Sequence, residues 1–439
     1  TKSRRVWRQN TRGDYWVLDL ETYDLRQIGA DRPESSLMFA KFDPAGQRVG
    51  YVSEHDVFVE DIGSGSVVRL THDGSGTLIN GTFDWVYEEE FFARDGFRWS
   101  PDGASIAFWQ LDAEGVRHFL MINNTDSVYS YTVPVEYPKA GGTNSAARVG
   151  VVSSAGGETT WCDVPGDMRD NYIPRMEWSG NSDEIVIQRM NRHQNTNQVM
   201  LCNAASGATR TILTETDPAY LDAVSDWQWL DGDKEFTWVS ERSGWRHLYR
   251  VSRDGKKVRA VTDDDDGWEI ARIQRLAEDG GRVYFTSSPE TATQRYLYRA
   301  RLNGRGDAEK LTPADQPGTH GYNISPDARF AIHTYSSFGS PTVTELIRLP
   351  GHEVIRPLME NRNQREAVAA LDRGKFEFFQ VDIGDVRLDA WMMYPPDFDP
   401  AQKYPILFYG YSEPWGQTVQ DSWGGGNYLW HVMLTQQGY

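Results

Sequence analysis

The residues best suited to chemistry form one short acidic run between aromatic side chains. Glu88, Glu89 and Glu90 follow Asp84-Trp85-Val86-Tyr87 and precede Phe91-Phe92. Like charges repel, and burial beside aromatic rings raises the pKa of a carboxyl group unless a cation is supplied. Most charge runs are solvated turns, but the apolar flanks on both sides favour a packed element. Carboxylates held in this way are suited to an ammonium group, which has three donors to share.

Other catalytic and metal-binding patterns are missing from the sequence. A serine hydrolase of the nucleophile-elbow type needs Gly-x-Ser-x-Gly, and no such pentapeptide occurs in the 439 residues. Ser412 is excluded as a nucleophile because Pro414 stands where the second glycine is needed. There is no His-Glu-x-x-His pattern, and the four aspartates at 263–266 fail the register of a calcium loop. We therefore expect no metal and no other cofactor, and interpret residues 263–266 as an acidic turn.

Composition excludes several classes of protein. The chain has 63 acidic residues against 45 Lys and Arg, a net charge of −18. This balance argues against a nucleic-acid partner, because phosphate neutralisation needs clustered basic residues. No apolar run approaches the ~20 residues of a membrane-spanning helix. Two cysteines, Cys162 and Cys202, exclude a disulfide-rich scaffold and a Cys-based zinc site. They leave open one bridge or two free thiols.

The elements that must position the acidic run are mostly strands. Short alternating runs rich in Val, Ile, Tyr, Phe and Trp lie between evenly spread Gly and Pro residues, which is typical of β-strands. One repeated unit is an apolar residue followed by a tight turn of Asp, Pro and Gly. Its copies lie at 42–46, 99–103, 178–181, 229–232, 276–280 and 324–327.

A second repeated unit is an alternating strand that ends in a polar turn. Seven such tails recur at roughly 45–55 residues, the spacing of four-stranded β-propeller blades. An irregular array of β-sandwiches is the alternative. The wide gap between residues 101 and 179 indicates an insertion, which we place at 123–142. The tails lie at 16–20, 57–61, 118–122, 198–202, 247–251, 296–300 and 343–347.

The character of the sequence changes near residue 375. Residues 375–394 alternate as one hairpin, and residues 404–411 form an apolar run of the kind buried in an α/β sheet. Residues 428–437 predict a helix ended by Gly438. We therefore predict a mostly β chain with a propeller domain at 1–374. Residues 375–439 are predicted to be the truncated N-terminal part of an α/β-hydrolase domain.

The acidic run and several other segments resemble one known family. Asn80-Gly81-Thr82-Phe83 leading into the acidic run is similar to the double-glutamate motif of the dipeptidyl peptidase IV family, which are prolyl oligopeptidase-type serine peptidases. The resemblance covers essentially the whole chain, in order, and implies an eight-bladed propeller followed by a hydrolase domain. About seven blades are then expected here, with the first missing. The other similar segments are 99–103, 137–141, 191–195, 243–249 and 394–411.

The resemblance implies a role for four residues. Glu89 and Glu90 would bind the α-ammonium of a peptide substrate. Arg8, after Trp7, would bind the substrate backbone carbonyl and steady the glutamates, although Arg4, Arg5 and Arg12 are close in sequence. A surface arginine is the structural alternative for Arg8. Tyr411 would donate its hydroxyl to the oxyanion, or else be an ordinary core tyrosine.

The resemblance also implies an activity. We expect a serine exopeptidase that releases N-terminal X-Pro or X-Ala dipeptides from a peptide substrate with a free N-terminus. The serine, aspartate and histidine of the triad would lie beyond Tyr439, so this chain should be inactive alone. Release of tripeptides, and a non-catalytic propeller that binds peptides or proteins, are the alternatives. A homodimer is left open. A periplasmic or secreted location is favoured over a cytoplasmic one.

Overall fold

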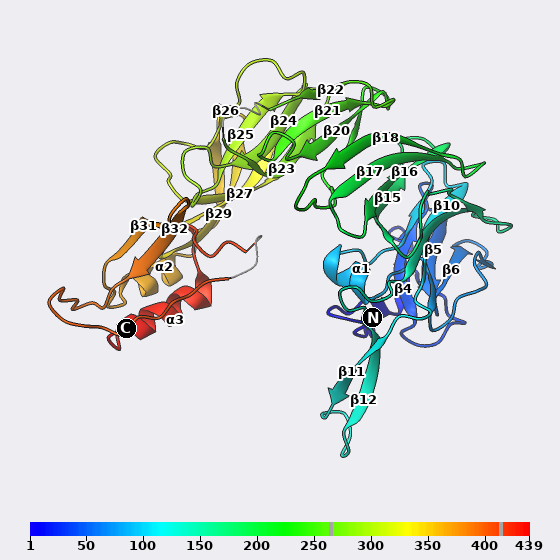
Figure 1. Cartoon of the computed structure of the whole chain (residues 1–439), viewed down its shortest axis with the longest axis horizontal. Helices are drawn as coiled ribbons and strands as arrows, with labels where there is room; N and C mark the ends of the chain where they lie inside the picture. Colours follow the sequence, from blue (N-terminus) through cyan, green and yellow to red (C-terminus); the bar gives the residue numbers. More distant parts are fainter. Residues whose placement is uncertain (263–266, 412–415) are drawn as a thin grey trace. The chain divides into compact units, whose positions relative to one another are not determined.

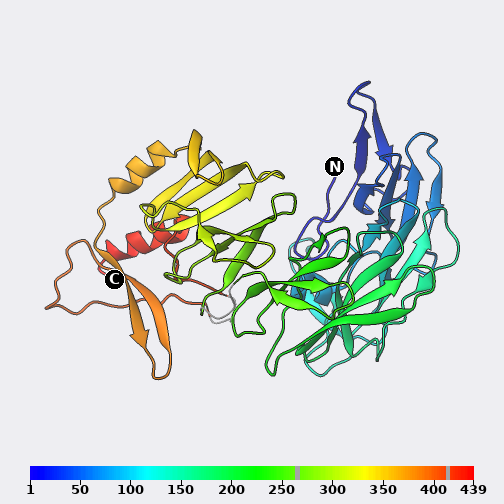
Figure 2. The same ribbon diagram turned by 90° about the horizontal axis from the view of Figure 1, so that it is seen from above.

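The chain folds into a succession of antiparallel sheets. A computed structural model of the protein describes residues 1–262, 267–411 and 416–439. Within these residues the chain is mostly β, with three short helices (Figure 1, Figure 2). The predicted fold class is confirmed at this level. The predicted acidic turn at 263–266 and Ser412 lie outside the described residues. The helices are α1 (Trp85–Glu90), α2 (Arg362–Ala369) and α3 (Gly425–Thr435).

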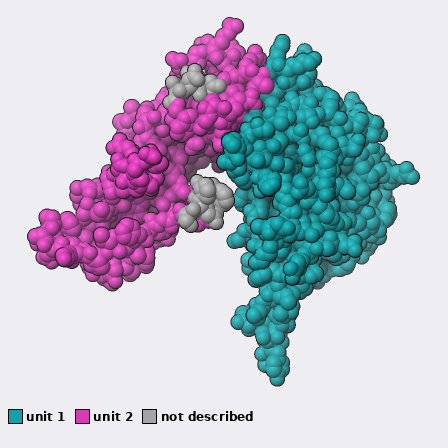
Figure 3. Space-filling model, in the orientation of Figure 1, with its two compact units in different colours: residues 1–236, 251–257 teal, residues 237–250, 258–439 magenta. Residues whose placement is uncertain are grey.

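Two compact units make up the chain. The first contains residues 1–236 and 251–257, and the second contains residues 237–250 and 258–439 (Figure 3). This division into compact units does not test the predicted boundary between two domains at residue 374, which stays a prediction.

Three sheets of four or five strands are described within the first unit. Their strands are antiparallel throughout. The first sheet has the order β1 (Arg12–Gly13), β4 (Leu37–Phe42), β5 (Arg48–Ser53), β6 (Asp56–Asp61) and β7 (Val67–Arg69). The second has the order β14 (Thr160–Trp161), β13 (Ala146–Ser153), β10 (Ser105–Asp112) and β8 (Leu78–Asn80), with β9 (Phe97–Trp99) also paired to β10. The third runs in order through β15 (Asn171–Trp178), β16 (Glu184–Asn191), β17 (Thr196–Asn203) and β18 (Thr209–Thr216).

Three further four-stranded sheets are described along the rest of the chain. Each has its strands in sequence order. The first contains residues of both units and consists of β19 (Trp229–Leu230), β20 (Glu235–Ser240), β21 (His247–Ser252) and β22 (Val258–Ala260). The next consists of β23 (Ile270–Ala277), β24 (Arg282–Ser287), β25 (Tyr296–Arg301) and β26 (Glu309–Lys310). The last consists of β27 (Thr319–Ile324), β28 (Phe330–Ser337), β29 (Ser340–Arg348) and β30 (Glu353–Met359).

The repeated turn unit predicted from the sequence has a consistent place in these sheets. Each of its six copies joins two strands that are neighbours in one sheet, as the turn at 43–46 joins β4 to β5. In that turn Asp43 Oδ1 accepts from the backbone N–H of Gln47 at 2.8 Å, and Gly46 adopts a φ of +69°. An aspartate that satisfies the turn backbone and a glycine that tolerates positive φ explain why these residues recur.

Strand β10 shows how neighbouring sheets pack. Ile106 and Phe108 pack with Val52 of the first sheet, whereas Trp109, on the opposite face, packs with Ile173 of the third. Alternate residues of a strand point to opposite faces, so an apolar run buries both faces at once. Face-to-face stacking of successive sheets is the packing that neighbouring propeller blades require.

Two of the seven predicted tails are not strands of a large sheet. Residues 16–20 overlap β2 (Tyr15–Leu18), and residues 118–122 lie in β11 (His118–Asn123). Among the strands that the structure describes, β2 pairs only with β3 (Leu25–Ile28) and β11 only with β12 (Tyr131–Glu136). The prediction was wrong at these two positions. Alternation identifies a strand with two unlike faces, but it does not give the number of partner strands.

The β11–β12 hairpin overlaps the predicted insertion at 123–142 and projects from the first unit as an arm (Figure 1). Its apolar side chains are largely exposed. The exposed fraction is 74 % for Ile122, 96 % for Val128 and 85 % for Tyr129. A hairpin that buries so little apolar surface contributes little to the core of its own unit.

The C-terminal predictions are confirmed in part. The hairpin is present as β31 (Phe376–Asp382) and β32 (Arg387–Met393), and α3 overlaps the predicted helix at 428–437. Residues 404–411, however, form no strand in the structure. The prediction of a buried strand was wrong here. A strand in the interior of an α/β sheet needs neighbouring strands to pair with its backbone on both sides. No described strand pairs with this segment, although Tyr409 packs on Trp391 and His431.

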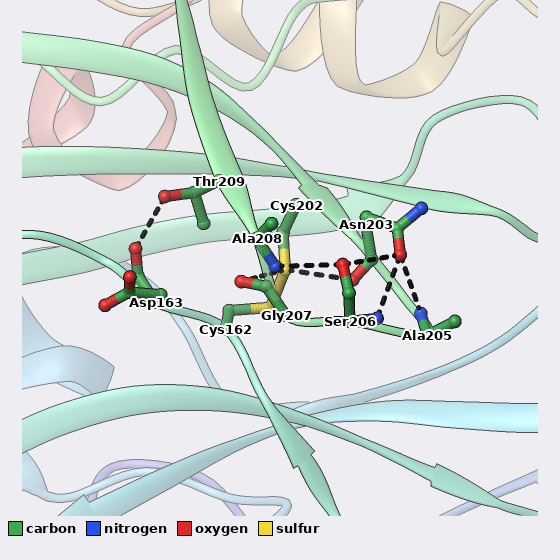
Figure 4. Close-up of a disulfide and its surroundings, with 9 residues drawn as sticks. All are labelled: Cys162, Asp163, Cys202, Asn203, Ala205, Ser206, Gly207, Ala208 and Thr209. Carbon is green, nitrogen blue, oxygen red and sulfur yellow. Dashed lines mark hydrogen bonds between the residues drawn. A yellow bond between two sulfur atoms is a disulfide. The ribbon is translucent and has the colours of Figure 1, made fainter.

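The two cysteines, left open by the sequence, form a disulfide (Figure 4). Cys162 follows β14 of the second sheet and Cys202 lies in β17 of the third, with their Cα atoms 6.0 Å apart. Beside the bridge the N–H of Asp163 donates to Gly207 O at 2.8 Å. The bond therefore joins two neighbouring sheets across 40 residues of chain.

A buried histidine cluster lies in the β27–β30 sheet of the second unit. His320 Nδ1 and His333 Nε2 are 2.9 Å apart, and His352 Nε2 is 2.9 Å from Tyr322 OH. All three histidines are buried, and Glu345 lies 3.4 Å from His333 Nδ1. Burial lowers the pKa of His320 to about 4 and of His333 to about 3, and it also lowers the pKa of His352.

This cluster predicts an acid-sensitive fold. The folded histidines stay neutral below pH 6.5, where the unfolded chain binds protons, so stability falls as the pH drops from about 6.5 towards 4. Above pH 6.5 these groups contribute no pH dependence. The conservative variant His333→Gln should reduce the fall in melting midpoint between pH 6.5 and 5, measured by circular dichroism. The control variant His72→Gln, at an exposed histidine, should show the same fall as the wild type. An equal fall in the wild type and both variants would contradict the role of the buried cluster in acid sensitivity.

Candidate functional site

The acidic run forms the short helix α1, and Asp84 begins it. The Asp84 Oδ1 atom accepts from the backbone N–H of Tyr87 at 3.0 Å, which is the usual bond of an N-cap. Its Oδ2 accepts from Ser145 Oγ at 2.6 Å. Asp84 is buried, and this burial raises the pKa of its carboxyl group. The helix start is thus fixed by a side chain that is fully enclosed.

Aromatic side chains hold α1 against the sheets of the first unit. Tyr87 is 2 % exposed, and its hydroxyl accepts from the N–H of Ile173 on β15 at 2.9 Å. Its ring stacks on Phe83 at 5.5 Å, and Phe83 meets Trp109 edge-on at 5.1 Å. The structure therefore favours the packed element over a solvated turn. This packing fixes the direction in which each of the three glutamates points.

Glu88 is the buried member of the three. It is 4 % exposed, and Arg94 Nε donates to its Oε1 at 3.3 Å. Burial raises the pKa of Glu88, and the charge of Arg94 opposes that rise. Glu88 thus takes part in an internal ion pair that anchors the helix.

Glu89 is bound by Arg8, which lies 81 residues earlier in the chain. Arg8 Nε donates to Glu89 Oε2 at 2.6 Å, and Arg8 Nη2 donates to the other oxygen, Oε1. A guanidinium that binds both oxygens of one carboxylate fixes its orientation as well as its charge. Of the four arginines considered in the sequence, it is Arg8 that binds the acidic run, while Arg4 lies 3.7 Å from Glu34.

Glu90 is the exposed member and lines a pocket of about 600 Å³. Trp85, Tyr137 and Arg192 are among the other lining residues. The charge of Glu90 reaches Tyr220, whose pKa is raised first by burial, then by Asp222, and to a lesser extent by Glu90.

Two of the three glutamates are held by arginines. Glu88 is paired with Arg94, and Glu89 is paired with Arg8. Glu89 and Glu90 are adjacent in the last turn of α1 and are half-buried and exposed, respectively. An ammonium group has three donors to share between two neighbouring carboxylates of this kind.

Tyr411 belongs to the second unit, whereas Arg8, Glu89 and Glu90 belong to the first. It is 57 % exposed and lies in a segment without regular secondary structure. A Cβ atom added to Gly416 would lie 1.9 Å from Tyr411 Cδ1, so the ring of Tyr411 would have to move to admit a side chain there. Its exposure does not agree with the alternative of a core tyrosine.

Sequence reasoning missed Asp84 as a cap and Arg94 as a partner. An aspartate three residues before Tyr87 is a recognisable cap signal, whereas nothing in the sequence pairs Arg94 with Glu88. Within the described parts of the chain no group of three or more His, Cys, Asp or Glu residues could hold a metal ion. In the same residues no helix is long and apolar enough to cross a membrane.

Comparisons with known proteins agree on one family. The family model described as the dipeptidyl peptidase IV N-terminal region matches residues 1–342. A probable dipeptidyl-aminopeptidase B of Emericella nidulans is 26 % identical over 95 % of this chain and 49 % of its own length. A probable dipeptidyl peptidase 4 of Aspergillus flavus is 26 % identical over 98 % of this chain and 57 % of its own. The chain thus spans about half the length of these relatives.

A solved structure gives the same result for the fold. The crystal structure of Porphyromonas gingivalis dipeptidyl peptidase 4 superposes with a TM-score of 0.91 at 29 % identity. The superposition covers all of this chain and 61 % of that one.

Proposed function

Because the chain belongs to the dipeptidyl peptidase IV family, we propose that it is the N-terminal region of a serine exopeptidase that removes dipeptides, X-Pro or X-Ala, from peptide N-termini. The observation that carries the proposal is the Arg8–Glu89 ion pair beside Glu90 on a helix fixed by buried aromatic residues. Glu89 and Glu90 bind the substrate ammonium. Arg8 orients Glu89 and donates to the substrate backbone carbonyl.

An ammonium site of this kind makes the enzyme an exopeptidase. A site held at a fixed distance from the nucleophile selects the peptide bond that lies a set number of residues from the N-terminus. An internal segment of a polypeptide brings no cation to the carboxylates, and desolvating them without a partner is heavily disfavoured. The site therefore discriminates by charge against blocked and internal sequences.

The chemical step belongs to the hydrolase domain that we place from residue 375 onward. There a serine, with histidine as its base and an aspartate to orient it, attacks the scissile carbonyl. Tyr411 donates its hydroxyl to the developing oxyanion together with a backbone N–H. The triad lies beyond Tyr439 in this proposal, and the six described sheets of four or five strands before residue 374 are blades of an eight-bladed propeller. The 439 residues alone then have no peptidase activity.

Labelling with a fluorophosphonate serine probe, followed by mass analysis of peptide products, tests the proposal on the full-length protein. We expect one covalent label and release of an X-Pro dipeptide from a peptide with a free N-terminus, with no cleavage of its N-acetylated form. Release of a tripeptide would identify the tripeptidyl alternative. A full-length protein that takes up no probe and cleaves no peptide would be the non-catalytic binder instead.

An oxidising location follows from the same proposal. We place the protein in the periplasm or outside the cell rather than in the cytoplasm, since structural disulfides persist in oxidising compartments and Cys162 and Cys202 are paired. Alkylation of whole cells before lysis tests this: the two cysteines should stay unmodified until a reductant is added.

The β11–β12 hairpin supports a homodimer. Side chains on both strands and at the tip are exposed, among them Phe119, Ile122 and Tyr131, and such an arm is suited to pairing with its copy in a second subunit. Replacing Ile122 and Val128 together with serine should shift the full-length protein from dimer to monomer in light scattering. The control Val67→Ser, at an exposed site on β7, should not. A monomer in the wild type would contradict the dimer.

A further inference from the structure

A second pocket lies in the first unit, next to the C-terminal end of α1. Its volume is about 750 Å³. The chain enters it directly after the glutamates, because Phe92, two residues beyond Glu90, lines it. Apart from the aromatic walls, three arginines line the pocket, Arg94, Arg98 and Arg175, against two carboxylates, Asp95 and Glu177. The proposed function assigns no role to this pocket.

Arg175 enters the pocket from a distortion in the edge strand β15. The register of β15 against β16 shifts between Tyr172 and Arg175, and Pro174 lies within the shift. Such a bulge changes the direction in which a side chain points, and an edge strand tolerates the proline. The guanidinium is then held by three hydrogen bonds: Nε donates to Ser225 Oγ at 2.9 Å, and Nη1 donates to Phe91 O at 2.9 Å and to Pro174 O at 2.7 Å.

All three of these acceptors are neutral. Among the residues that the structure describes, no carboxylate forms an ion pair with Arg175, and no acceptor bonds its Nη2. Burial lowers the pKa of the Arg175 guanidinium below its ordinary value, and repulsion from Arg98 lowers it further. A half-buried cation without a counter-ion is costly. Arg175 is therefore poised for an anion that enters the pocket.

The other two arginines differ in this respect. Arg94 is paired with Glu88 at 3.3 Å, and Arg98 Nε donates to Glu177 at 2.9 Å. Asp95 is shared between Lys41 and Arg98. The local carboxylates are thus engaged with other cations, which leaves Arg175 as the charge that a ligand would meet.

Aromatic rings supply the rest of the pocket wall. Trp227 and Trp229 are half-buried, and Phe92 is 75 % exposed. Phe92 also has a φ of +54°, a conformation that is rare for a bulky residue and is often found at functional sites. Flat apolar surfaces around a cation favour a ligand that combines a planar or apolar body with a negative group.

We propose that this pocket binds a carboxylate carried on an apolar or aromatic body, with Arg175 as its charged contact and Trp227 and Phe92 as its apolar walls. Two sources share this chemistry. One is an acidic side chain of the peptide held at Glu89 and Glu90, and the other is a free organic acid. Only the first source rests on the proposed peptidase function.

Binding of 3-phenylpropionate to the full-length protein, followed by tryptophan fluorescence and calorimetry, tests the site. We expect saturable binding that is at least tenfold tighter than that of 3-phenylpropanamide, which has nearly the same shape and no charge. In Arg175→Gln the preference for the acid should be lost. The matched control is Arg189→Gln, in the same sheet, because Arg189 bonds the amide oxygens of Asn171 and Gln198 and does not line the pocket.

Two further variants keep the test decisive. If Arg175→Gln melts at a lower temperature than the wild type, the variant Trp227→Leu is tested in its place. It should weaken the binding of 3-phenylpropionate and of 3-phenylpropanamide to the same extent. Glu89→Gln should leave 3-phenylpropionate binding unchanged, so failure of the ammonium site is distinguishable from failure of this one. Equal affinity for acid and amide, or an acid preference that survives in Arg175→Gln, would overturn the proposal.

Rates of substrate hydrolysis distinguish the two sources of the carboxylate. A full-length enzyme that hydrolyses Glu-Pro-p-nitroanilide faster than Gln-Pro-p-nitroanilide, and loses that preference in Arg175→Gln, takes its carboxylate from the substrate. Equal hydrolysis of the two, with 3-phenylpropionate binding intact, identifies a free organic acid.

Discussion

Replacing Glu89 with glutamine is expected to lower kcat/KM of the full-length enzyme for a dipeptidyl substrate about 100-fold. Glutamine keeps the shape of the side chain but removes the charge that, in the proposed function, binds the substrate ammonium. Loss of one partner from a desolvated charge pair costs about 2–5 kcal/mol, and about 2.7 kcal/mol corresponds to 100-fold. Arg8 would lose its partner as well, but its side chain is 70 % exposed, so water can solvate it.

Steady-state kinetics with Ala-Pro-p-nitroanilide measure this effect. The matched control is Glu114→Gln, an exposed glutamate outside the site, which should retain wild-type kinetics. Glu90→Gln should behave as Glu89→Gln does. A loss of less than about threefold in Glu89→Gln, with correct folding, would mean that the ammonium is bound elsewhere.

Removal of the Cys162–Cys202 disulfide is expected to have the largest effect on stability. The bond closes a loop over a sequence separation of 40 residues, and its loss from a loop of this length costs about 4 kcal/mol in the chain-entropy description. Replacing both cysteines with serine avoids a free thiol. For a unit of this size the melting midpoint should fall by roughly 10 °C.

Differential scanning calorimetry in the presence and absence of a reductant checks this prediction. The reduced wild-type protein should have the same melting midpoint as the double variant. The midpoint of the double variant should not change when the reductant is added. If the oxidised wild type and the double variant melt within about 1 °C of each other, the bond does not contribute to stability as described.

Much of the fold could be predicted because its signals are local. The turn residues at 43–46 and 100–103 and the alternating strands appear in the sequence where they occur in the structure. The number of partners of a strand is not local, so the same alternation at 16–20 and 118–122 was assigned to large sheets. The apolar run at 404–411 was assigned to a buried strand for the same reason, since pairing depends on residues far away in the sequence.

Some residues of the site could be predicted from local sequence, and others could not. The acidic run stands out because charges between aromatic residues are unusual, and resemblance to a family then singled out Arg8. The pairing of Glu88 with Arg94 depends on the direction in which α1 points its side chains, which the buried ring of Tyr87 fixes. Arg175 depends on a bulge in β15, and a strand pattern carries no signal for the register of its partner.

The most direct test of the ammonium site is calorimetric binding of one peptide in two forms to a full-length protein whose nucleophilic serine is replaced by alanine. The peptide Ala-Pro-Ala-Phe should bind at least about 100-fold more tightly with a free N-terminus than with an acetylated one. Glu89→Gln should remove most of that difference. Equal affinity of the two forms for the wild-type site would contradict the assignment of Glu89, Glu90 and Arg8.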